Sequence, residues 1–344
     1  MRIRNRYLHI MAALIVLPWL QASVCQAYDP YHLLKEIAVG GEGGWHGLAI
    51  DESAHRLYLA HENRIEVVDT EDGGVVGAIT NTPGVHDICL APQFRCGFAS
   101  NTREDKMTIF NLRTLRTSKA KTGKGPEAVL ISGGDLLVFN AAAPSVSFYE
   151  VDDADFVGTM PLPGRPGSAA GDWKARRVYC AIQDKAEVAV IDGERHKLLG
   201  QWPVAPGEAP SGIAIDTEQH RLFVGCANKL LLMVNSTNGS VLNTIPIGAD
   251  SDTVVFEPST GLVFVAGGEG VITIAHEDAP DKLSLVQTLP TGPGARTIAL
   301  DTKTHRVYVP VASTGSSTSS ASSANAANGS LRILVFGPEP VQSH

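Results

Sequence analysis

Residues that could bind a ligand recur in this sequence at a nearly constant interval. Each stands immediately before a short apolar segment of strand character, and the successive intervals are 40, 41, 40, 44, 41 and 44 residues. The series consists of His46, His86, Glu127, Gly167, Ser211, Asp252 and Arg296. Imidazole, carboxylate and guanidinium groups at equivalent positions of a repeat would meet on one face if the repeats close into a ring.

A second series follows the next strand-like segment of the first three repeats. His61, Asn101 and Asn140 end these segments. Because an antiparallel neighbour returns the chain to the same face, we expect these side chains to join the first series at one rim. The predicted rim then holds three histidines, one glutamate and two asparagines.

Imidazole and carboxylate together are typical ligands of zinc, copper or iron. The set His46, His61, His86 and Glu127 is therefore a candidate site for one divalent metal ion, which would be the only cofactor. Ligand affinity at such a site should fall below about pH 6.5, the ordinary pKa of histidine. The alternative is a wet channel mouth whose polar residues bind one another or water, since the sequence contains no His-x-x-x-His motif.

Four further residues of the rim are candidates for contacts with an organic ligand, namely Asn101, Asn140, Asp252 and Arg296. Asp252 and Arg296 belong to neighbouring repeats, so we predict an ion pair between them. An anionic ligand held by Arg296 is the alternative.

The elements that position these residues are visible as an internal repeat. Residues 47–60 read GLAID followed by RLYLA, residues 212–225 read GIAID followed by RLFVG, and residues 297–310 read TIALD followed by RVYVP. Each unit of about 40 residues holds four short alternating segments separated by turn residues, which is typical of a propeller blade. The sequence therefore predicts an all-β, seven-bladed β-propeller.

The last blade has only three strands of its own, because proline at 338 and 340 cannot donate to a further ladder. Residues 32–39 have the pattern of an outer strand. We predict that they pair with residues 331–336 and close the ring, which removes the exposed edge.

The repeat resembles that of the YVTN-type β-propeller proteins, a family of exported bacterial and archaeal proteins. The second strand reads YLAH at 58–61 and YVPV at 308–311, the third reads VAVID at 188–192, and the outer one reads VLNTIPIG at 241–248. The resemblance covers residues 31–336. It implies the fold and export, and it implies little about function because the family is defined by its repeat.

Residues 1–27 of the 344 are predicted to be a signal peptide, with three arginines, an apolar run and a small-residue end. Residues 28–344 would form a single domain, a monomer in the periplasm or secreted, with no membrane insertion after cleavage. It would carry 25 basic and 36 acidic residues, which argues against a nucleic-acid partner. Residues 312–329, rich in Ser, Ala and Asn, are predicted to form a flexible loop.

Four cysteines remain after the predicted cleavage. Cys89 and Cys96 flank a predicted hairpin and could form a disulfide, whereas Cys180 and Cys226, like the first two, could equally be small buried side chains in strands.

Two functions of different classes fit the sequence. The first is a non-catalytic binding or scaffold propeller whose channel-mouth face takes a protein, a glycan or a small-molecule ligand. The second is a metal-dependent hydrolase similar to the gluconolactonase-like propellers, in which a channel-bound cation activates water. No catalytic motif such as Gly-x-Ser-x-Gly is present.

Overall fold

The computed structural model of the chain describes residues 29–41, 44–312 and 330–338. The predicted signal peptide lies outside these residues. The predicted loop at 312–329 also lies outside them, except for Ala312, which ends a strand.

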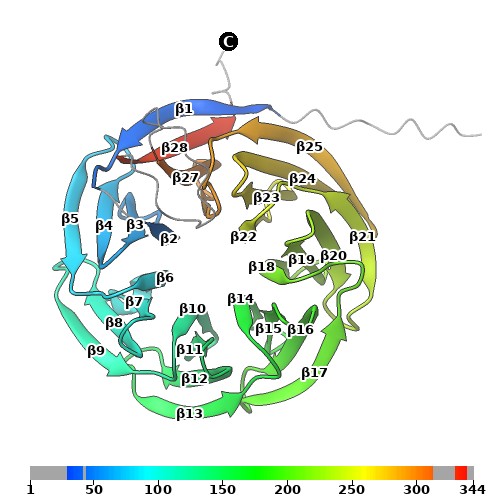
Figure 1. Cartoon of the computed structure of the whole chain (residues 1–344), viewed down its shortest axis with the longest axis horizontal. Coiled ribbons are helices and arrows are strands. Elements are labelled where there is room, and N and C mark those ends of the chain that lie inside the picture. The colour runs from blue at the N-terminus through cyan, green and yellow to red at the C-terminus, as the bar shows by residue number, and fades with distance from the viewer. Residues whose placement is uncertain (1–28, 42–43, 313–329, 339–344) are drawn as a thin grey trace, which may run out of the picture.

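Seven four-stranded antiparallel sheets stand in a ring around a central axis, as Figure 1 shows. The first blade consists of β2 (Trp45–Asp51), β3 (Arg56–His61), β4 (Arg64–Asp69) and β5 (Val75–Thr80). The second consists of β6 (Val85–Ala91), β7 (Cys96–Asn101), β8 (Lys106–Asn111) and β9 (Thr117–Lys121), with a 3-10 turn η1 (Pro92–Phe94) after its inner strand. The third consists of β10 (Pro126–Ser132), β11 (Asp135–Asn140), β12 (Ser145–Glu150) and β13 (Phe156–Pro161).

The fourth blade consists of β14 (Pro166–Asp172), β15 (Arg177–Ile182), β16 (Glu187–Asp192) and β17 (Lys197–Pro203). The fifth consists of β18 (Pro210–Asp216), β19 (Arg221–Cys226), β20 (Leu230–Asn235) and β21 (Val241–Pro246). The sixth consists of β22 (Ser251–Glu257), β23 (Leu262–Gly267), β24 (Val271–Ala279) and β25 (Lys282–Pro290). The seventh consists of β26 (Ala299–Asp301), β27 (Arg306–Ala312), β28 (Leu331–Pro338) and β1 (Tyr31–Ala38). The predicted seven-bladed propeller is confirmed.

The turns that follow the inner strands of the first, fourth, fifth and seventh blades share one local design, in which an aspartate side chain accepts from backbone N–H groups of the turn. In the first blade the Oδ1 atom of Asp51 accepts hydrogen bonds from the backbone N–H groups of Ser53 and Ala54 at 3.1 and 3.0 Å. His55 then adopts a left-handed conformation with φ of 53°, which histidine tolerates better than a β-branched residue does. His220 and His305 take the same conformation in the fifth and seventh blades. These recurring histidines therefore shape turns on the face opposite the predicted rim.

The ring is closed by the N-terminal strand, as predicted. β1 pairs antiparallel with β28, with Leu33 opposite Phe336 and Ile37 opposite Ile333. Both strands lie at the top of Figure 1, where the first and last colours of the chain meet. The pairing removes the edge that a three-stranded blade would expose.

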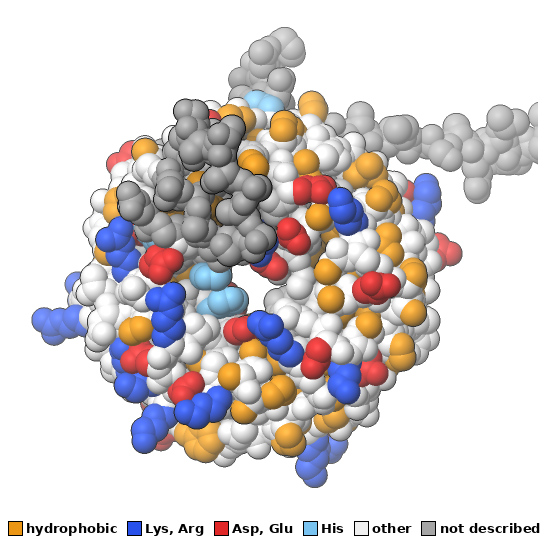
Figure 2. Space-filling view, viewed as in Figure 1, with side chains coloured by type: hydrophobic (Ala, Val, Ile, Leu, Met, Phe, Trp, Pro, Cys, Tyr) orange, Lys and Arg blue, Asp and Glu red, His pale blue; other side chains and the backbone are white. Residues whose placement is uncertain are grey.

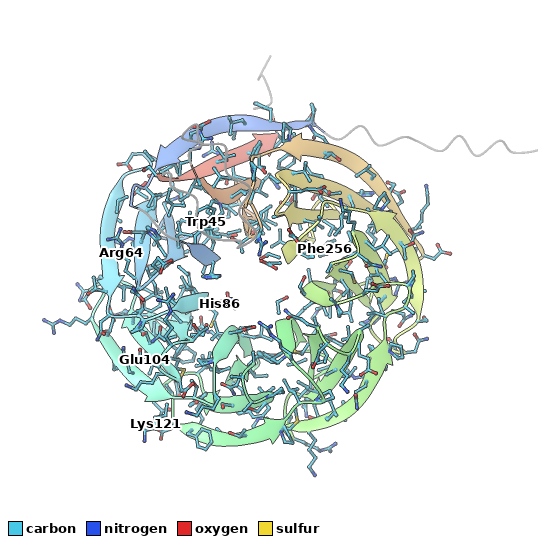
Figure 3. The ribbon with its side chains drawn as sticks, in the orientation of Figure 1. Trp45, Arg64, His86, Glu104, Lys121 and Phe256 are labelled. Atoms are coloured by element: carbon cyan, nitrogen blue, oxygen red, sulfur yellow. The ribbon has the colours of Figure 1, made fainter. Side chains whose placement is uncertain are left out.

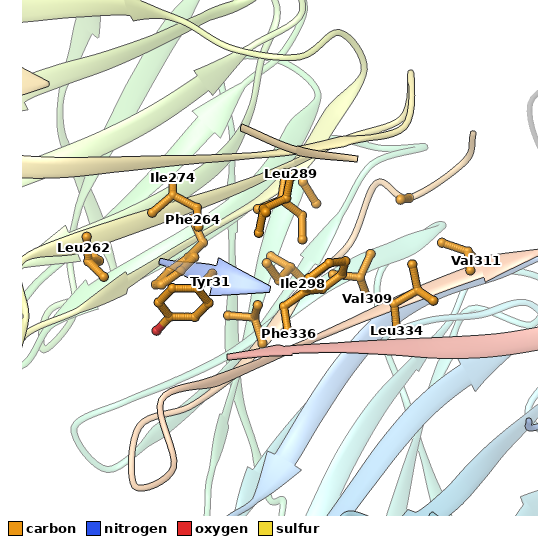
Figure 4. Close-up of a cluster of buried hydrophobic side chains, with 14 residues drawn as sticks. Tyr31, Leu262, Phe264, Ile274, Leu289, Ile298, Val309, Val311, Leu334 and Phe336 are labelled. Atoms are coloured by element: carbon orange, nitrogen blue, oxygen red, sulfur yellow. The ribbon is translucent and has the colours of Figure 1, made fainter. Parts of the chain in front are cut away.

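The beginning of β1 also joins the seventh blade to the sixth. Tyr31 is 4% exposed, and its ring packs against Phe264 with centroids 5.1 Å apart, in the cluster that Figure 4 shows. Its backbone carbonyl accepts a hydrogen bond from Nε2 of Gln287, and its N–H donates to Oε1 of the same side chain. The strand thus contacts both blades next to the closure.

The cysteines Cys89, Cys96, Cys180 and Cys226 are all free thiols. Cys89 lies opposite Phe98 and Cys96 lies opposite Ala91, so the two residues of the suggested disulfide are not direct cross-strand partners. Both pack instead against one apolar cluster between the second and third blades, which fits the alternative of small side chains in strands. Among the described residues, no helix is long and apolar enough to cross a bilayer.

Closure by β1 predicts a large effect of a small truncation. A chain that begins at Gly40 should have a much lower midpoint of thermal unfolding and should associate through the exposed edge of β28. Loss of the buried Tyr31 and Ile37 side chains alone removes roughly 1.5–3 kcal/mol each. Thermal unfolding and sizing by light scattering measure both effects, with a chain that begins at Asp29 as the control. A Gly40 chain that stays monomeric and equally stable would contradict this account of closure.

Candidate functional site at the channel mouth

A cavity of about 460 Å³ lies at one end of the central channel. It is lined by all seven residues of the first predicted series: His46, His86, Glu127, Gly167, Ser211, Asp252 and Arg296. Figure 2 shows this face, with histidine side chains at the edge of the opening and acidic and basic side chains elsewhere around it. The expected convergence of His46, His86 and Glu127 is therefore observed, and the alignment of the seven repeats is correct.

A β-bulge places these residues in the cavity. In the first six blades the register between the inner strand and its partner shifts at the position of the series, for example between Trp45 and Leu48 and between Val85 and Ile88. A bulge leaves a residue outside the ladder and turns its side chain away from the regular pleat. In the seventh blade Arg296 precedes β26 altogether. The local break in pairing is thus what directs each of these side chains toward the axis.

The two histidines form a stacked pair. The rings of His46 and His86 have centroids 4.4 Å apart and planes 28° apart, and Figure 3 shows His86 at the edge of the central opening. Burial and the proximity of His86 lower the pKa of His46 to about 4. Burial, assisted by Arg165, lowers the pKa of His86 to about 4 as well. Both imidazoles are neutral at pH 7 and offer one donor and one acceptor nitrogen each.

Three ion pairs, formed by two arginines, occupy other parts of the mouth. Nη2 of Arg165 lies 2.9 Å from Oε1 of Glu127. Arg296 lies between two carboxylates, with Nη1 3.9 Å from Oδ2 of Asp252 and Nη2 3.6 Å from Oδ2 of Asp250. The predicted pairing of Asp252 with Arg296 is observed. Desolvation nevertheless raises the pKa of Asp252 above its ordinary value, because the long contact to Arg296 only partly offsets the burial.

Hydrogen bonds between neighbouring inner strands hold the mouth in shape. Asp87 accepts from the backbone N–H of Val129 in the next blade at 3.0 Å, and Ser168 accepts from Ile213 at 2.9 Å. Thr297 donates to the backbone carbonyl of His46 at 2.9 Å, which joins the last blade to the first. These bonds link the backbones that carry the cavity residues, so the mouth is a pre-formed site rather than a set of independent loops.

The second predicted series does not reach the cavity. His61 is 1% exposed and its Nδ1 lies 3.4 Å from Oε1 of Glu66. Asn101 donates to Thr108 at 2.7 Å, and Asn140 donates to Ser147 at 3.1 Å. The prediction that His61, Asn101 and Asn140 join the rim is therefore wrong in position.

The physical reason is the depth of the second strand within a blade. β3, β7 and β11 lie one strand further from the axis than β2, β6 and β10, which stand between them and the channel. His61 is also covered from above, because a Cβ atom added to Gly41 would lie 2.8 Å from its Cε1 atom. These three polar side chains stabilise the interior of their blades.

The predicted metal set is not assembled either. Among the described residues the one group of three whose ligand atoms lie within 4.8 Å of one another is Glu150, Asp152 and Asp153, on an exposed turn. His46 and His86 stack, and stacked rings direct their nitrogen lone pairs along nearly parallel planes instead of toward a common point. Glu127 is engaged by Arg165. The arrangement favours the alternative of a polar, hydrogen-bonding mouth.

Sequence reasoning did not identify Arg165 or Asp87 as residues of the cavity. Arg165 stands two positions before Gly167, in a Pro-Gly-Arg-Pro-Gly segment between blades, and a search of the repeat positions alone passes over it. Asp87 directly follows His86, where the other blades have small residues such as Gly47 and Ala128. A charged residue at a repeat position where the other blades have small residues could have identified Asp87 as a residue of the cavity.

Comparison with family models finds no match, and comparison with curated proteins finds none either. Several solved structures share the fold. Hydrazine synthase of Kuenenia stuttgartiensis matches with a TM-score of 0.70 and 12% identity over 78% of this chain and 92% of that one. The structure of U3-55K matches with a TM-score of 0.72 and 12% identity over 89% of this chain and 98% of that one. The RRP9 WD40 repeats match with a TM-score of 0.74 and 12% identity over 90% of this chain and 97% of that one. At this identity the similarity shows the propeller fold alone.

The lowered pKa values predict a dependence of stability on pH. Between pH 6.5 and 4 the unfolded histidines bind protons and the folded His46 and His86 do not, so acidification through this range destabilises the fold. Each histidine contributes up to roughly 1.4 kcal/mol per pH unit to the slope. Burial raises the pKa of Asp87 to about 6, which acts in the opposite direction.

The test is urea unfolding at pH 7, 6 and 5 of the natural protein and of the His46→Asn/His86→Asn variant. Because Asp87 is present in both, the difference between the two curves isolates the histidines. The variant should lose less stability on acidification. Parallel curves would show that the two imidazoles are not held neutral by the fold.

Proposed function

We propose that this chain is an exported, non-catalytic binding protein that holds a small polar ligand at the channel mouth. The observation that carries the proposal is the convergence of six bulge residues and Arg296 on one cavity of about 460 Å³. A concave site of this size with a few convergent polar groups is typical of small-molecule binding.

The groups at the mouth define the chemistry of the ligand. Neutral His46 and His86 supply hydrogen-bond donors and acceptors without a charge. Arg165 meets Glu127 through one nitrogen, and Arg296 meets each of its two carboxylates through one nitrogen. Neither guanidinium forms a bidentate fork with a carboxylate of the protein, so a planar anionic group of a ligand could form one. A small molecule with one carboxylate and several hydrogen-bonding groups fits this set.

The serines at the mouth support binding over acyl transfer. The hydroxyl of Ser211 donates to the backbone carbonyl of Ser251, and the hydroxyl of Ser168 accepts from the N–H of Ile213. Neither is arranged as a nucleophile on a histidine, which is the geometry that activates a serine.

The likeness of the repeat to YVTN-type propellers and the character of residues 1–27 support export to the periplasm or the medium. The full chain made in a bacterial host should be cut after Ala27, so the purified protein should begin with Tyr28. Intact-mass measurement checks this. A protein that retains Met1 in the cytoplasmic fraction would contradict export.

The binding proposal is tested with a library of amino acids, small carboxylic acids and hydroxy acids by ligand-observed NMR. We expect at least one carboxylate-bearing member to bind, and the His46→Asn/His86→Asn variant to bind it about tenfold or more weakly, which corresponds to about 1.4 kcal/mol. An Arg165→Gln variant should weaken anionic members more than neutral ones.

The matched control is the His55→Asn/His220→Asn variant, which changes two histidines in turns on the opposite face and keeps residues that tolerate a left-handed conformation. It should bind as the natural protein does. Equal loss in both double variants, or binding unchanged by the first, would contradict the assignment of the site to the channel mouth.

A further inference from the structure

A second cavity lies on the opposite face of the propeller, between the third and fourth blades. Its volume is about 440 Å³, within the range of roughly 300–1,000 Å³ that is usual for ligand pockets. The turns that connect the strands of these two blades line it, whereas the channel mouth is formed where the inner strands begin. The two cavities share no residue.

A difference in turn length creates the space. The hairpin between β10 and β11 has only Gly133 and Gly134 between its strands, while the equivalent hairpin between β14 and β15 has four residues, 173–176. No heavy atom lies within 4 Å of a Cβ atom added at either glycine. The turn of the third blade is therefore too short to cover the longer turn of the fourth blade, whose near side stays exposed.

Trp173 stands in that longer turn with 66% of its surface exposed, more than any other large apolar residue described. At the same position the first, fifth and seventh blades have Glu52, Thr217 and Thr302. The turn itself is fixed, because the buried Asp172 accepts a hydrogen bond from the N–H of Ala175 at 2.9 Å. An exposed indole on a rigid turn loses little conformational entropy when a ligand covers it.

Paired polar groups surround the indole. Nε2 of His196 lies 2.8 Å from Oδ2 of Asp135, and the His196 ring stacks on Phe148 with centroids 4.0 Å apart. Nη1 of Arg176 lies 2.5 Å from Oε2 of Glu194. Asp135, Arg176, Glu194 and His196 line the cavity together with Trp173. Arg176 and Glu194 pair opposite charges and Asp135 contacts the His196 ring, so the cavity presents many donors and acceptors.

The adjacent lysine does not compete for this space. Nζ of Lys174 is bound to Oε1 of Glu218, which lies in the turn of the fifth blade. Lys174 therefore extends toward the fifth blade, away from the third. The indole remains the principal apolar surface of the cavity.

We propose that this cavity is a binding site for a neutral saccharide, with one sugar ring stacked on Trp173. A pyranose has a face of C–H groups that matches an indole and hydroxyls at its edge that both donate and accept. Asp135 and Glu194 would accept from those hydroxyls, and Arg176 and His196 would donate to them. A quaternary cation or an acidic peptide fits less well, because Arg176 and Glu194 already pair with each other and the Asp135 carboxylate already contacts His196.

The test uses saturation-transfer difference NMR on the protein that begins at Tyr28, with cellobiose, maltose, lactose, mannobiose and chitobiose as probes. At least one disaccharide should bind and quench tryptophan fluorescence. Trp173→Ala should weaken that binding about tenfold or more, and Trp173→Phe should weaken it less because an aromatic face remains. Gly134→Leu should also abolish binding by filling the space in front of the indole, since no neighbouring atom obstructs a side chain there.

Phe156→Ala is the matched control, because Phe156 is 63% exposed on an outer strand and does not line the cavity. It should bind the disaccharide as the natural protein does. Absence of binding by every disaccharide at millimolar concentration would overturn the proposal, as would binding that Trp173→Ala leaves unchanged. Selective binding of an aromatic or proline-rich peptide that Trp173→Ala abolishes would assign the cavity to a peptide instead. None of these results bears on the channel mouth, so the two sites are tested separately.

Discussion

The pairing of β1 with β28 is the interaction on which the arrangement of the whole ring depends. When seven sheets pack face to face in a ring, the first and the last sheet must be joined. The last sheet is one strand short until Tyr31–Ala38 completes it. Backbone pairing of β1 with β28 ties the seventh blade to the first, because β2 of the first blade follows β1 in the chain. The packing of Tyr31 on Phe264 and the Gln287 contacts then join the same strand to the sixth blade. Because every blade contributes residues to the channel mouth, a ring that opens between the first and seventh blades would also separate the residues of the site.

Within the closed ring, irregular pairing is what produces the site. Each inner strand pairs regularly with its neighbour along most of its length, but the register shifts near its first residues, at the channel mouth. The bonds of Asp87 to Val129 and of Thr297 to His46 then hold the inner edges of neighbouring blades together. Burial in this setting keeps His46 and His86 neutral, so the mouth combines uncharged hydrogen-bonding groups with two partly satisfied arginines.

The repeat made most of the fold predictable. A unit that recurs seven times specifies its own strands, its neighbours and the position that faces the axis, and this is why His46 and Arg296 could be placed in one cavity although 250 residues separate them. Strand depth was harder to predict. His61 and Asn140 end strands on the correct face, but an inner strand stands between them and the channel.

Features that occur only once in the chain could not be predicted from the repeat either. The residue types alone suggested a metal site, but His46 and His86 stack on each other instead. The orientation of a side chain depends on its neighbours in space, which the repeat pattern does not specify. Arg165 lies between repeats, and Trp173 is a single substitution in a turn. The pattern that identifies the fold averages over such residues, so it does not predict their roles.

The closure also sets an order of events for a chain that emerges from a ribosome with its N-terminus first. The strand Tyr31–Ala38 appears at the beginning, and its partner Leu331–Pro338 appears only after nearly the whole chain; the Glu36–Arg332 contact joins residues 296 positions apart. Six blades can form while this first strand waits unpaired, as an edge available to other chains. The state most prone to association with other chains is therefore a nearly complete one. It lasts until the last blade has been synthesised and pairs with the first strand.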